Sequence, residues 1–211
     1  MGFFQKLKEA VAAADRKGEL EEERRERLRG TGVECSKSTK KQFDSFIAFD
    51  VETTGLDPKK DRIIELSALR FEHGEIVDRF STLINPQRKI PEEVSKLTHI
   101  RDKDVESAPV ESKVMDKFSF WIGDAKEGET VMVAHNAPFD VSFIESAFKR
   151  SGVDAKLKYV DTLSIARKNL PDLENHKLGT VAEHFGIKLK NAHRAGSDAD
   201  ACGLIFIELM K

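Results

Sequence analysis

Two apolar, β-branched segments on either side of a short polar turn constrain the fold of this chain most strongly. They run from Ile63 to Phe71 and from Ile76 to Ile84, and the intervening Glu72-His73-Gly74-Glu75 is typical of a β-hairpin connection. A shorter apolar run, Phe46 to Phe49, precedes them and suits a buried strand. The sequence therefore predicts three consecutive strands that form an antiparallel meander.

The rest of the body alternates between strand and helix patterns. Short strands are expected at Thr130 to Ala134 and at Leu157 to Val160. Three antiparallel strands followed by this alternation predict an α/β fold, with a mixed five-stranded sheet and helices on its faces. Helical periodicity and start signals predict helices beginning at Pro91 and spanning Val110 to Ile122, Asp140 to Arg150, Thr162 to Asn169, Lys177 to Phe185 and Ser197 to Met210.

Residues 1–42 differ in composition from the body, residues 43–211. Phe3, Phe4 and Leu7 recur at helical spacing, so a short amphipathic helix is expected from Gly2 to Arg16. A mixed-charge run and a polar linker follow, which together predict a charged, partly helical extension. Two interpretations stay open: a solvated tail, or an element that docks on a polymerase or other protein, a membrane surface or the body itself.

Composition excludes few functions. The chain has 211 residues, of which 39% are hydrophobic, enough for one buried core. Its formal net charge of −2 neither supports nor excludes a nucleic-acid partner. No apolar run approaches the length of a membrane span and the N-terminus lacks a signal-peptide stretch, so no integral membrane association is expected. Cys35 and Cys202 lack metal-site spacing, which favours a reducing, cytoplasmic location.

Asp50 and Glu52 are the first candidates for chemistry. They lie two positions apart at the end of an apolar strand, so both side chains are expected on the same face of the sheet. Adjacent carboxylates repel each other unless a proton or a cation lies between them, and hard oxygen ligands suit Mg²⁺ or Mn²⁺. The pair alone is equally compatible with a solvated strand end, because strong turn sequence follows it.

Two later segments supply further candidates. In His135-Asn136-Ala137-Pro138-Phe139-Asp140, which joins a strand to a helix, Asp140 is either a first-turn acid or a third carboxylate at the carboxyl end of a neighbouring strand. In His193-Arg194-Ala195-Gly196-Ser197-Asp198, before the last helix, Asp198 is either a first-turn acid or a fourth metal ligand. His193 lies in the polar approach to that helix, where an exposed or functional histidine is expected.

Taken together, these segments resemble a known family. Val-Glu-Thr-Thr-Gly after a strand, then Asn-Ala-Pro-Phe-Asp, then His-Arg-Ala-x-x-Asp resemble the motifs of DnaQ-like 3′→5′ exonucleases of the DEDDh subgroup. The resemblance is strongest to the proofreading exonucleases of bacterial DNA polymerase III, and it covers Phe46 to about Met210. It implies a ribonuclease H-like fold for the body.

The resemblance also implies roles for individual residues. Its four acids, which hold two divalent ions, Mg²⁺ or Mn²⁺, match Asp50, Glu52, Asp140 and Asp198, and its general base matches His193. Two such ions stabilise the attacking and leaving oxygens of a displacement at phosphorus, and the product is a nucleoside 5′-monophosphate. Weaker matches imply substrate contacts at Thr53, Thr54, Leu56, His99, Asn136 and Phe139.

Three residues are assigned structural roles. Asp161 is interpreted as the cap of the helix that begins at Thr162, and not as a metal ligand. Cys202 and Phe206 are expected in the core.

Three functions are compatible with the sequence. The first is a 3′→5′ exonuclease acting on DNA with a free 3′ end, single-stranded DNA being favoured, in proofreading or repair. The second is an exoribonuclease or short-oligonucleotide hydrolase with the same chemistry, because sugar discrimination depends on the pocket near the 2′ position. The third is a non-catalytic module that docks through residues 1–42.

Overall fold

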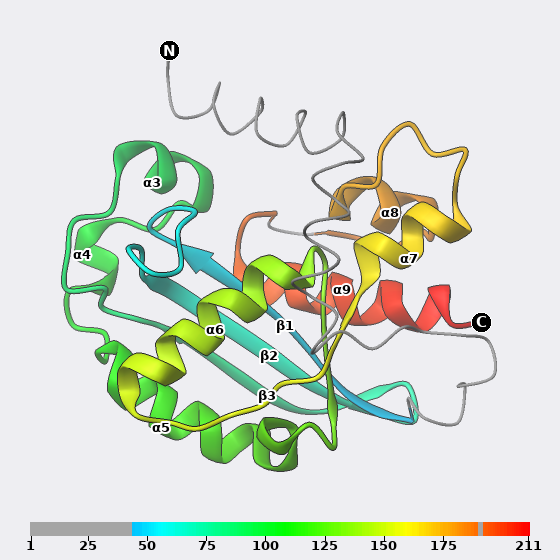
Figure 1. Cartoon of the computed structure of the whole chain (residues 1–211). Helices are drawn as coiled ribbons and strands as arrows, with labels where there is room; N and C mark the ends of the chain where they lie inside the picture. Colours follow the sequence, from blue (N-terminus) through cyan, green and yellow to red (C-terminus); the bar gives the residue numbers. More distant parts are fainter. Residues whose placement is uncertain (1–43, 190–191) are drawn as a thin grey trace.

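The computed structural model describes residues 44–189 and 192–211, so the expected helix from Gly2 to Arg16 lies outside the described residues (Figure 1). One sheet has the order β3-β2-β1-β4-β5. β1, β2 and β3 are antiparallel neighbours, whereas β4 runs parallel to β1 and β5 parallel to β4. The predicted meander and mixed sheet are therefore confirmed. The strands are β1 (Ser45–Thr53), β2 (Ile63–Glu72), β3 (Glu75–Leu83), β4 (Val131–Ala134) and β5 (Tyr159–Asp161).

The helices predicted for the body are all present, with two short additions. α4 and η2 were not predicted, because segments this short show no helical periodicity. Among the described residues, no helix is long and apolar enough to cross a membrane. The helices are α3 (Glu92–Thr98), α4 (Asp102–Val105), α5 (Glu111–Ile122), η2 (Gly123–Glu127), α6 (Ala137–Ser151), α7 (Thr162–Asn169), α8 (Leu178–His184) and α9 (Ala195–Leu209).

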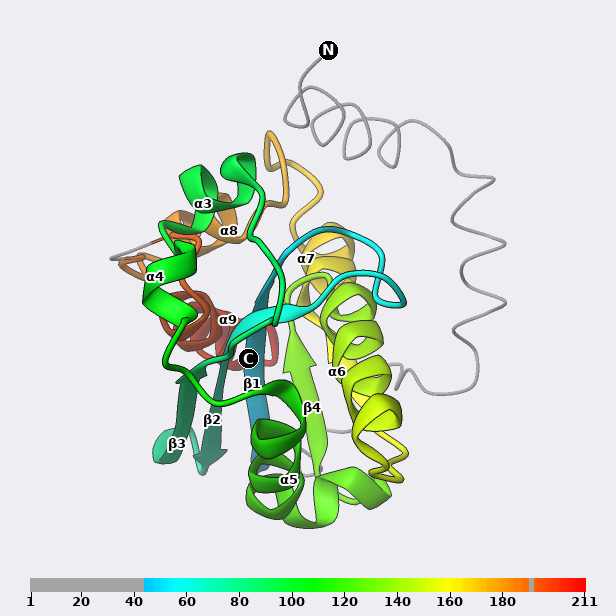
Figure 2. The same cartoon turned by 90° about the vertical axis from the view of Figure 1, so that its left-hand side faces the viewer.

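β1 divides its side chains between two cores. Ile47, Phe49 and Val51 belong to the core shared with α5 and α6, whereas Phe46 and Ala48 belong to the core beneath α9. Figures 1 and 2 show α5 and α6 on one face of the sheet and α9 across the other. Because side chains alternate along a strand, the even-numbered residues that follow Ala48 point to the α9 side.

α9 lies unusually close to the sheet. A Cβ atom added to Gly203 would overlap the ring of Phe71 and lie 3.1 Å from the Cβ of Ala48. The ring of Phe46 stacks on Phe71 at 4.7 Å and meets Phe206 edge-on at 4.9 Å. Cys202 and Phe206 are buried, so their predicted place in the core is confirmed. This packing holds the second half of α9 against β1 and β2.

Two helices begin earlier than the sequence predicts, because residues far away in the chain cap them. α6 begins at Ala137 and not at Asp140; Oδ1 of Asp161 accepts hydrogen bonds from the backbone N–H groups of Asn136 (2.8 Å) and Ala137 (3.2 Å). α9 begins at Ala195 and not at Ser197. Asp161 also accepts the N–H of Leu163 at 3.2 Å, which confirms its predicted role as the cap of α7.

Candidate active site

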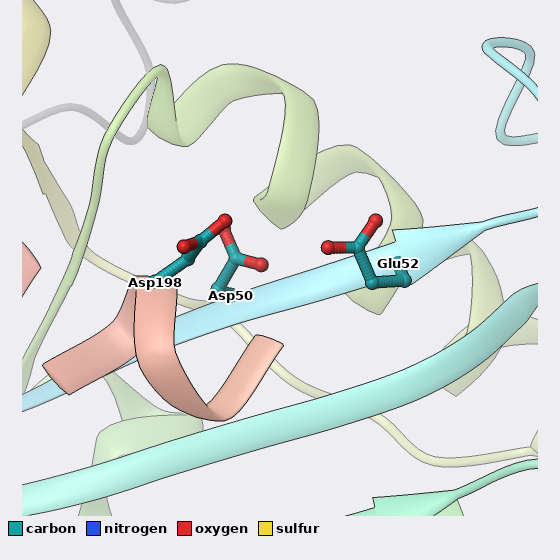
Figure 3. Close-up of side chains that lie close together, drawn as sticks. All are labelled: Asp50, Glu52 and Asp198. Carbon is teal, nitrogen blue, oxygen red and sulfur yellow. The ribbon is translucent and has the colours of Figure 1, made fainter. Parts of the chain in front are cut away.

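Three of the predicted carboxylates converge on one point. Ligand oxygens of Asp50, Glu52 and Asp198 all lie within 4.8 Å of one another. Figure 3 shows Asp50 and Glu52 rising from the same face of β1 while Asp198 reaches them from the first turn of α9. The alternation predicted for the strand is therefore present, and neither acid lies at a frayed strand end, because β1 continues to Thr53.

Asp140 lies beside this group but outside it. Its carboxylate is buried in the first turn of α6, and its Oδ1 accepts a hydrogen bond from the backbone N–H of Val51 at 3.2 Å. Val51 separates Asp50 from Glu52 in the sequence, so Asp140 is joined to the backbone of the acidic pair. The structure thus brings three of the four acids into one ligand group and holds the fourth against the same strand.

The four carboxyl groups destabilise one another as anions. Burial, reinforced by neighbouring acids, raises the pKa of Glu52 to about 8, and burial raises the pKa of Asp198 to about 6. Burial and the charges of Asp140 and Glu52 raise the pKa of Asp50 well above its usual value. Burial likewise raises the pKa of Asp140, although the hydrogen bond from Val51 opposes the increase. A cation bound here would relieve this repulsion.

Asp198 gives independent support for a cation. Its Oδ2 accepts the backbone N–H of His193 at 3.1 Å, but its Oδ1 is buried and has no hydrogen-bond partner within the described part of the chain. A buried carboxylate oxygen without a partner is costly, and a metal ion is one of the partners that removes the cost. The donor set consists of carboxylate oxygens, which are the preferred ligands of Mg²⁺ and Mn²⁺. The residues present therefore fit a divalent cation.

His193 is held next to the acidic group by its backbone. It adopts the left-handed conformation with φ of 64°, and its N–H is bonded to Asp198. The side chain is exposed, yet the surrounding protein removes part of its hydration, which lowers the pKa of His193, and nearby His99 lowers it further. The imidazole is consequently neutral at physiological pH and able to accept a proton.

The two threonines after the acidic pair use their hydroxyl groups within their own loop. Thr53 Oγ1 donates to the carbonyl of Gly55 at 2.6 Å, and Thr54 Oγ1 accepts the N–H of Arg62 at 3.1 Å. Both residues are buried, whereas Leu56 at the tip of the loop is 49% exposed. Of these three predicted substrate contacts, Leu56 is the one whose side chain is presented to solvent.

The other three predicted substrate contacts differ in backbone conformation and in packing. His99 is exposed at the end of α3, also in the left-handed conformation. Asn136 precedes α6 with φ of 72°. Phe139 packs against the core, with its ring 5.0 Å from that of Phe143. His99 thus lies near His193, whereas Phe139 is largely a packing residue.

Sequence reasoning missed two charged residues beside the site. Glu65 on β2 lies directly opposite Glu52 in the antiparallel register, and it is 4% exposed. Its carboxylate is paired with the guanidinium group of Arg194, with Nη2 and Oε1 2.6 Å apart. A glutamate inside an otherwise apolar strand was the available signal, because such a residue is rarely buried without a partner.

His135, the first residue of the second motif, also organises the loop before α6. Its ring nitrogens contact Oγ1 of Thr162 at 2.9 Å and the backbone carbonyl of His176 at 2.8 Å. Burial lowers the pKa of His135, so the ring is neutral. A neutral ring that bonds at both nitrogens ties the start of α6 to the start of α7.

A five-stranded mixed sheet with acids on β1, α6 and α9 defines a ribonuclease H-like nuclease fold. The sequence profile of the exonuclease family RNase_T matches residues 47–206, and the chain belongs to that family. The expected DnaQ-like membership and the ribonuclease H-like fold are thereby confirmed.

The curated relatives are much longer proteins. The chain is 43% identical over 166 residues to the PolC-type DNA polymerase III of Caldanaerobacter subterraneus, covering 79% of this chain and 12% of that protein. It is also 43% identical over 158 residues to the PolC-type DNA polymerase III of Clostridium perfringens, covering 75% and 11%. The similarity is therefore confined to a small part of each polymerase.

Solved structures with the same fold include two bacterial exonucleases. Escherichia coli exonuclease I bound to a dT13 oligonucleotide has a TM-score of 0.67 at 19% identity, covering 79% of this chain and 40% of that one. Exonuclease X in complex with 5′ overhanging duplex DNA has a TM-score of 0.61 at 22% identity, covering 78% and 90%. At these identities the comparison establishes the fold.

Proposed function

We propose that this protein is a metal-dependent 3′→5′ exonuclease that hydrolyses the terminal phosphodiester bond of DNA and releases nucleoside 5′-monophosphates. The observation that carries the proposal is the convergence of Asp50, Glu52 and Asp198, with the buried Oδ1 of Asp198 lacking a protein partner among the described residues. Clustered buried acids destabilise a fold, so their presence in one group supports a role in binding cations.

In this proposal Asp50, Glu52 and Asp198 hold divalent cations, Mg²⁺ or Mn²⁺, and Asp140 completes the set for a second ion. Bound ions would supply the positive charge that stabilises the attacking and leaving oxygens at phosphorus. The hydrogen bond from Val51 leaves Asp140 with a second carboxylate oxygen, so the assignment does not require that bond to break.

His193 is the proposed general base. It is exposed, adjacent to Asp198 and neutral near pH 7, so one of its ring nitrogens can accept the proton of an attacking water. The new oxygen–phosphorus bond forms as the bond from phosphorus to the 3′ oxygen of the preceding nucleotide breaks. The 3′ oxygen leaves with the bonding electrons and takes up a proton from solvent water, and the chain is shorter by one nucleotide.

DNA is the proposed substrate because of what the relatives are. The longer relatives are DNA polymerases, and the structural neighbours were solved with a single-stranded oligonucleotide or an overhanging duplex. A single strand with a free 3′ end is accordingly the favoured substrate, and exposed Leu56 would pack against a terminal base. Association with a polymerase is part of the same proposal.

The test uses the full chain and two labels. With Mg²⁺, DNA labelled at its 5′ end should shorten progressively from the 3′ end, while DNA labelled at its 3′ nucleotide should release that nucleotide as a 5′-monophosphate. EDTA and Asp50→Ala should both stop the reaction. Faster digestion of a matched RNA would instead identify the protein as an exoribonuclease. Release of the 5′ nucleotide first would show that digestion runs in the 5′→3′ direction.

A further inference from the structure

Glu65 is a buried acid next to the candidate active site, yet it does not belong to the ligand group. It lies opposite Glu52 on neighbouring antiparallel strands and points to the same face of the sheet. Like charges placed directly opposite each other in this way repel. The position therefore needs a compensating charge, and the compensating residue comes from the segment that carries His193.

Arg194 supplies that charge through a bidentate ion pair. Its Nη2 donates to Oε1 of Glu65 at 2.6 Å and its Nε donates to Oε2 at 3.0 Å, across 129 residues of sequence. The Glu65 side chain is 6% exposed and that of Arg194 is 43% exposed. Paired parallel hydrogen bonds of this kind fix the orientation of the guanidinium plane as well as its distance.

Glu65 also holds the start of α9. The backbone N–H of Ala195 donates to Oε2 of Glu65 at 3.0 Å, whereas Arg194, the N-cap residue, makes no side-chain cap of its own. A carboxylate at this place satisfies one of the unpaired N–H groups of the helix and suits the positive end of its dipole. β2 therefore caps α9 from outside the helix.

These contacts and the hydrogen bond to Asp198 together hold the segment that begins at His193. Its N–H is bound by Asp198 on one side, and the next two residues are bound by Glu65 on the other. The left-handed conformation of His193 is unfavourable for a residue with a Cβ atom, and it persists only where the surrounding structure holds it. The ion pair is the side-chain contact that anchors this turn to the sheet.

We propose that Glu65 and Arg194 are positioning residues, whose ion pair, buried on the Glu65 side, holds the backbone of His193 in the reactive arrangement. The inference rests on the proposed nuclease function of the same site. It assigns the pair no contact with substrate and no place among the metal ligands. Loss of the pair should lower kcat, while KM and the Mg²⁺ concentration that gives half-maximal activity stay unchanged.

The decisive experiment combines Arg194→Ala with His193→Ala. In the wild-type background Arg194→Ala should lower kcat at least about tenfold, as is typical when a supporting residue of a reactive group is removed. If Arg194 acts through His193, the same change made in His193→Ala should alter kcat by less than about twofold. An equal loss in both backgrounds would overturn the proposal, because Arg194 would then act independently of His193.

Glu65→Gln tests the other half of the pair. The amide oxygen can still accept the N–H of Ala195, so the helix cap is preserved while the charge is removed. It should lower kcat with an unchanged Mg²⁺ requirement. An increase of about tenfold or more in that requirement would make Glu65 a metal ligand and overturn the proposal. Arg194→Lys should recover part of the activity lost in Arg194→Ala, because it restores the charge without the paired geometry.

Arg79→Ala is the matched control. Arg79 joins β3 to α9 through Asp200 at 2.9 Å, but this pair is exposed and lies on the flank of the helix. Its loss should leave kcat within about twofold of wild type. Circular dichroism establishes that each variant is folded, and the double variant Glu65→Gln/Arg194→Ala avoids an unpaired buried charge if Arg194→Ala is unstable.

Loss of the proposed nuclease activity and loss of the positioning role give different results. If the wild-type protein released no nucleotides from DNA or RNA, the proposed function would fall. If the wild type were active and folded Arg194→Ala and Glu65→Gln kept full kcat, the positioning role alone would be refuted.

Discussion

The backbone N–H of Val51 donates a hydrogen bond to Oδ1 of Asp140, 89 residues further along the chain, at 3.2 Å. This bond joins the middle of the acidic strand to the first turn of α6, so the two elements cannot move independently. The acids of the candidate site thus stand on a strand and two helices that contact one another, and rigid support of this kind is what a metal site requires.

Asp198→Asn should abolish high-affinity metal binding. Removing one carboxylate from the group takes away a ligand, and we expect Mg²⁺- or Mn²⁺-dependent activity to fall more than about 1,000-fold. Calorimetric titration with Mn²⁺ measures the binding. Asp200→Asn is the control, because Asp200 lies two residues further along α9 and pairs with Arg79 at the surface. Equal Mn²⁺ affinity in Asp198→Asn and wild type would contradict the assignment.

The metal-free protein should lose stability as the pH rises. The pKa of Glu52 is about 8 and that of Asp198 about 6 in the folded protein, against ordinary values of 4.5 and 3.8. Between these limits the folded state binds more protons than the unfolded state, so the free energy of unfolding decreases with pH. In EDTA, Tm should therefore be lower at about pH 8 than at about pH 5.5.

Mg²⁺ should counteract that loss, because it competes with the same protons for the carboxylates. The rise in Tm on adding Mg²⁺ should consequently be larger at the higher pH. Glu52→Gln should flatten the pH dependence measured in EDTA. A Tm in EDTA that is the same at both pH values would show that these acids are not jointly protonated in the metal-free protein.

His193→Ala should separate binding from catalysis. The backbone N–H of His193, and not its ring, bonds to Asp198, so the metal ligands should keep their positions. We expect unchanged Mn²⁺ binding and a fall in kcat of about 100-fold or more, the usual contribution of a general base. His184→Ala is a control outside the site, on α8. Loss of Mn²⁺ affinity in His193→Ala would contradict the assignment of metal binding to the acids and of proton acceptance to His193.

Asp161→Ala should destabilise the protein. Its carboxylate accepts three backbone N–H groups, and Ser164 Oγ donates to it at 2.7 Å. Removing this acceptor should lower the free energy of unfolding by about 2–4 kcal/mol. Urea denaturation measures the change, and Asp172→Ala, at an exposed position, is the control. A loss below about 0.5 kcal/mol would mean that water replaces the carboxylate.

Gly203→Ala should test how tightly α9 is pressed against the sheet. The added methyl group would overlap Phe71, and overpacking of this kind costs about 1–3 kcal/mol. Gly179 in α8 has no atom within 4 Å of an added Cβ, so Gly179→Ala should instead stabilise the protein by up to about 1 kcal/mol. In thermal denaturation we expect Tm to fall in Gly203→Ala and to rise in Gly179→Ala. A change of Tm in the same direction in both variants would contradict the packing.

Local patterns were sufficient to predict the sheet. The hairpin signal and the apolar runs specify β1 to β3, and the two-residue spacing of Asp50 and Glu52 specifies their common face. The predicted starts of α6 and α9 lie a few residues after the observed ones. Their caps come from Asp161 and Glu65, and the local sequence does not indicate a cap from a distant residue.

The candidate site could be predicted only as a set of motifs. That Asp50 and Asp198 share one ligand group follows from the placement of α9 across β1, which is a tertiary property. The ion pair of Glu65 and Arg194 is likewise set by packing: an apolar strand pattern marks Glu65 as unusual, but nothing in the sequence identifies Arg194 as its partner. Hydroxyl groups such as that of Thr54 resemble substrate contacts until the structure shows their internal partners.

The acidic group joins β1 to α9, so its ligands are assembled from elements that are far apart in the chain. During synthesis, β1 to β5 can emerge and pair before Asp198 leaves the ribosome, and domains generally fold as units in the order of synthesis. Nascent chains that have not docked α9 would carry Asp50 and Glu52 without their third partner. The order of the elements thus means that the ligand group is completed only when α9 docks on β1.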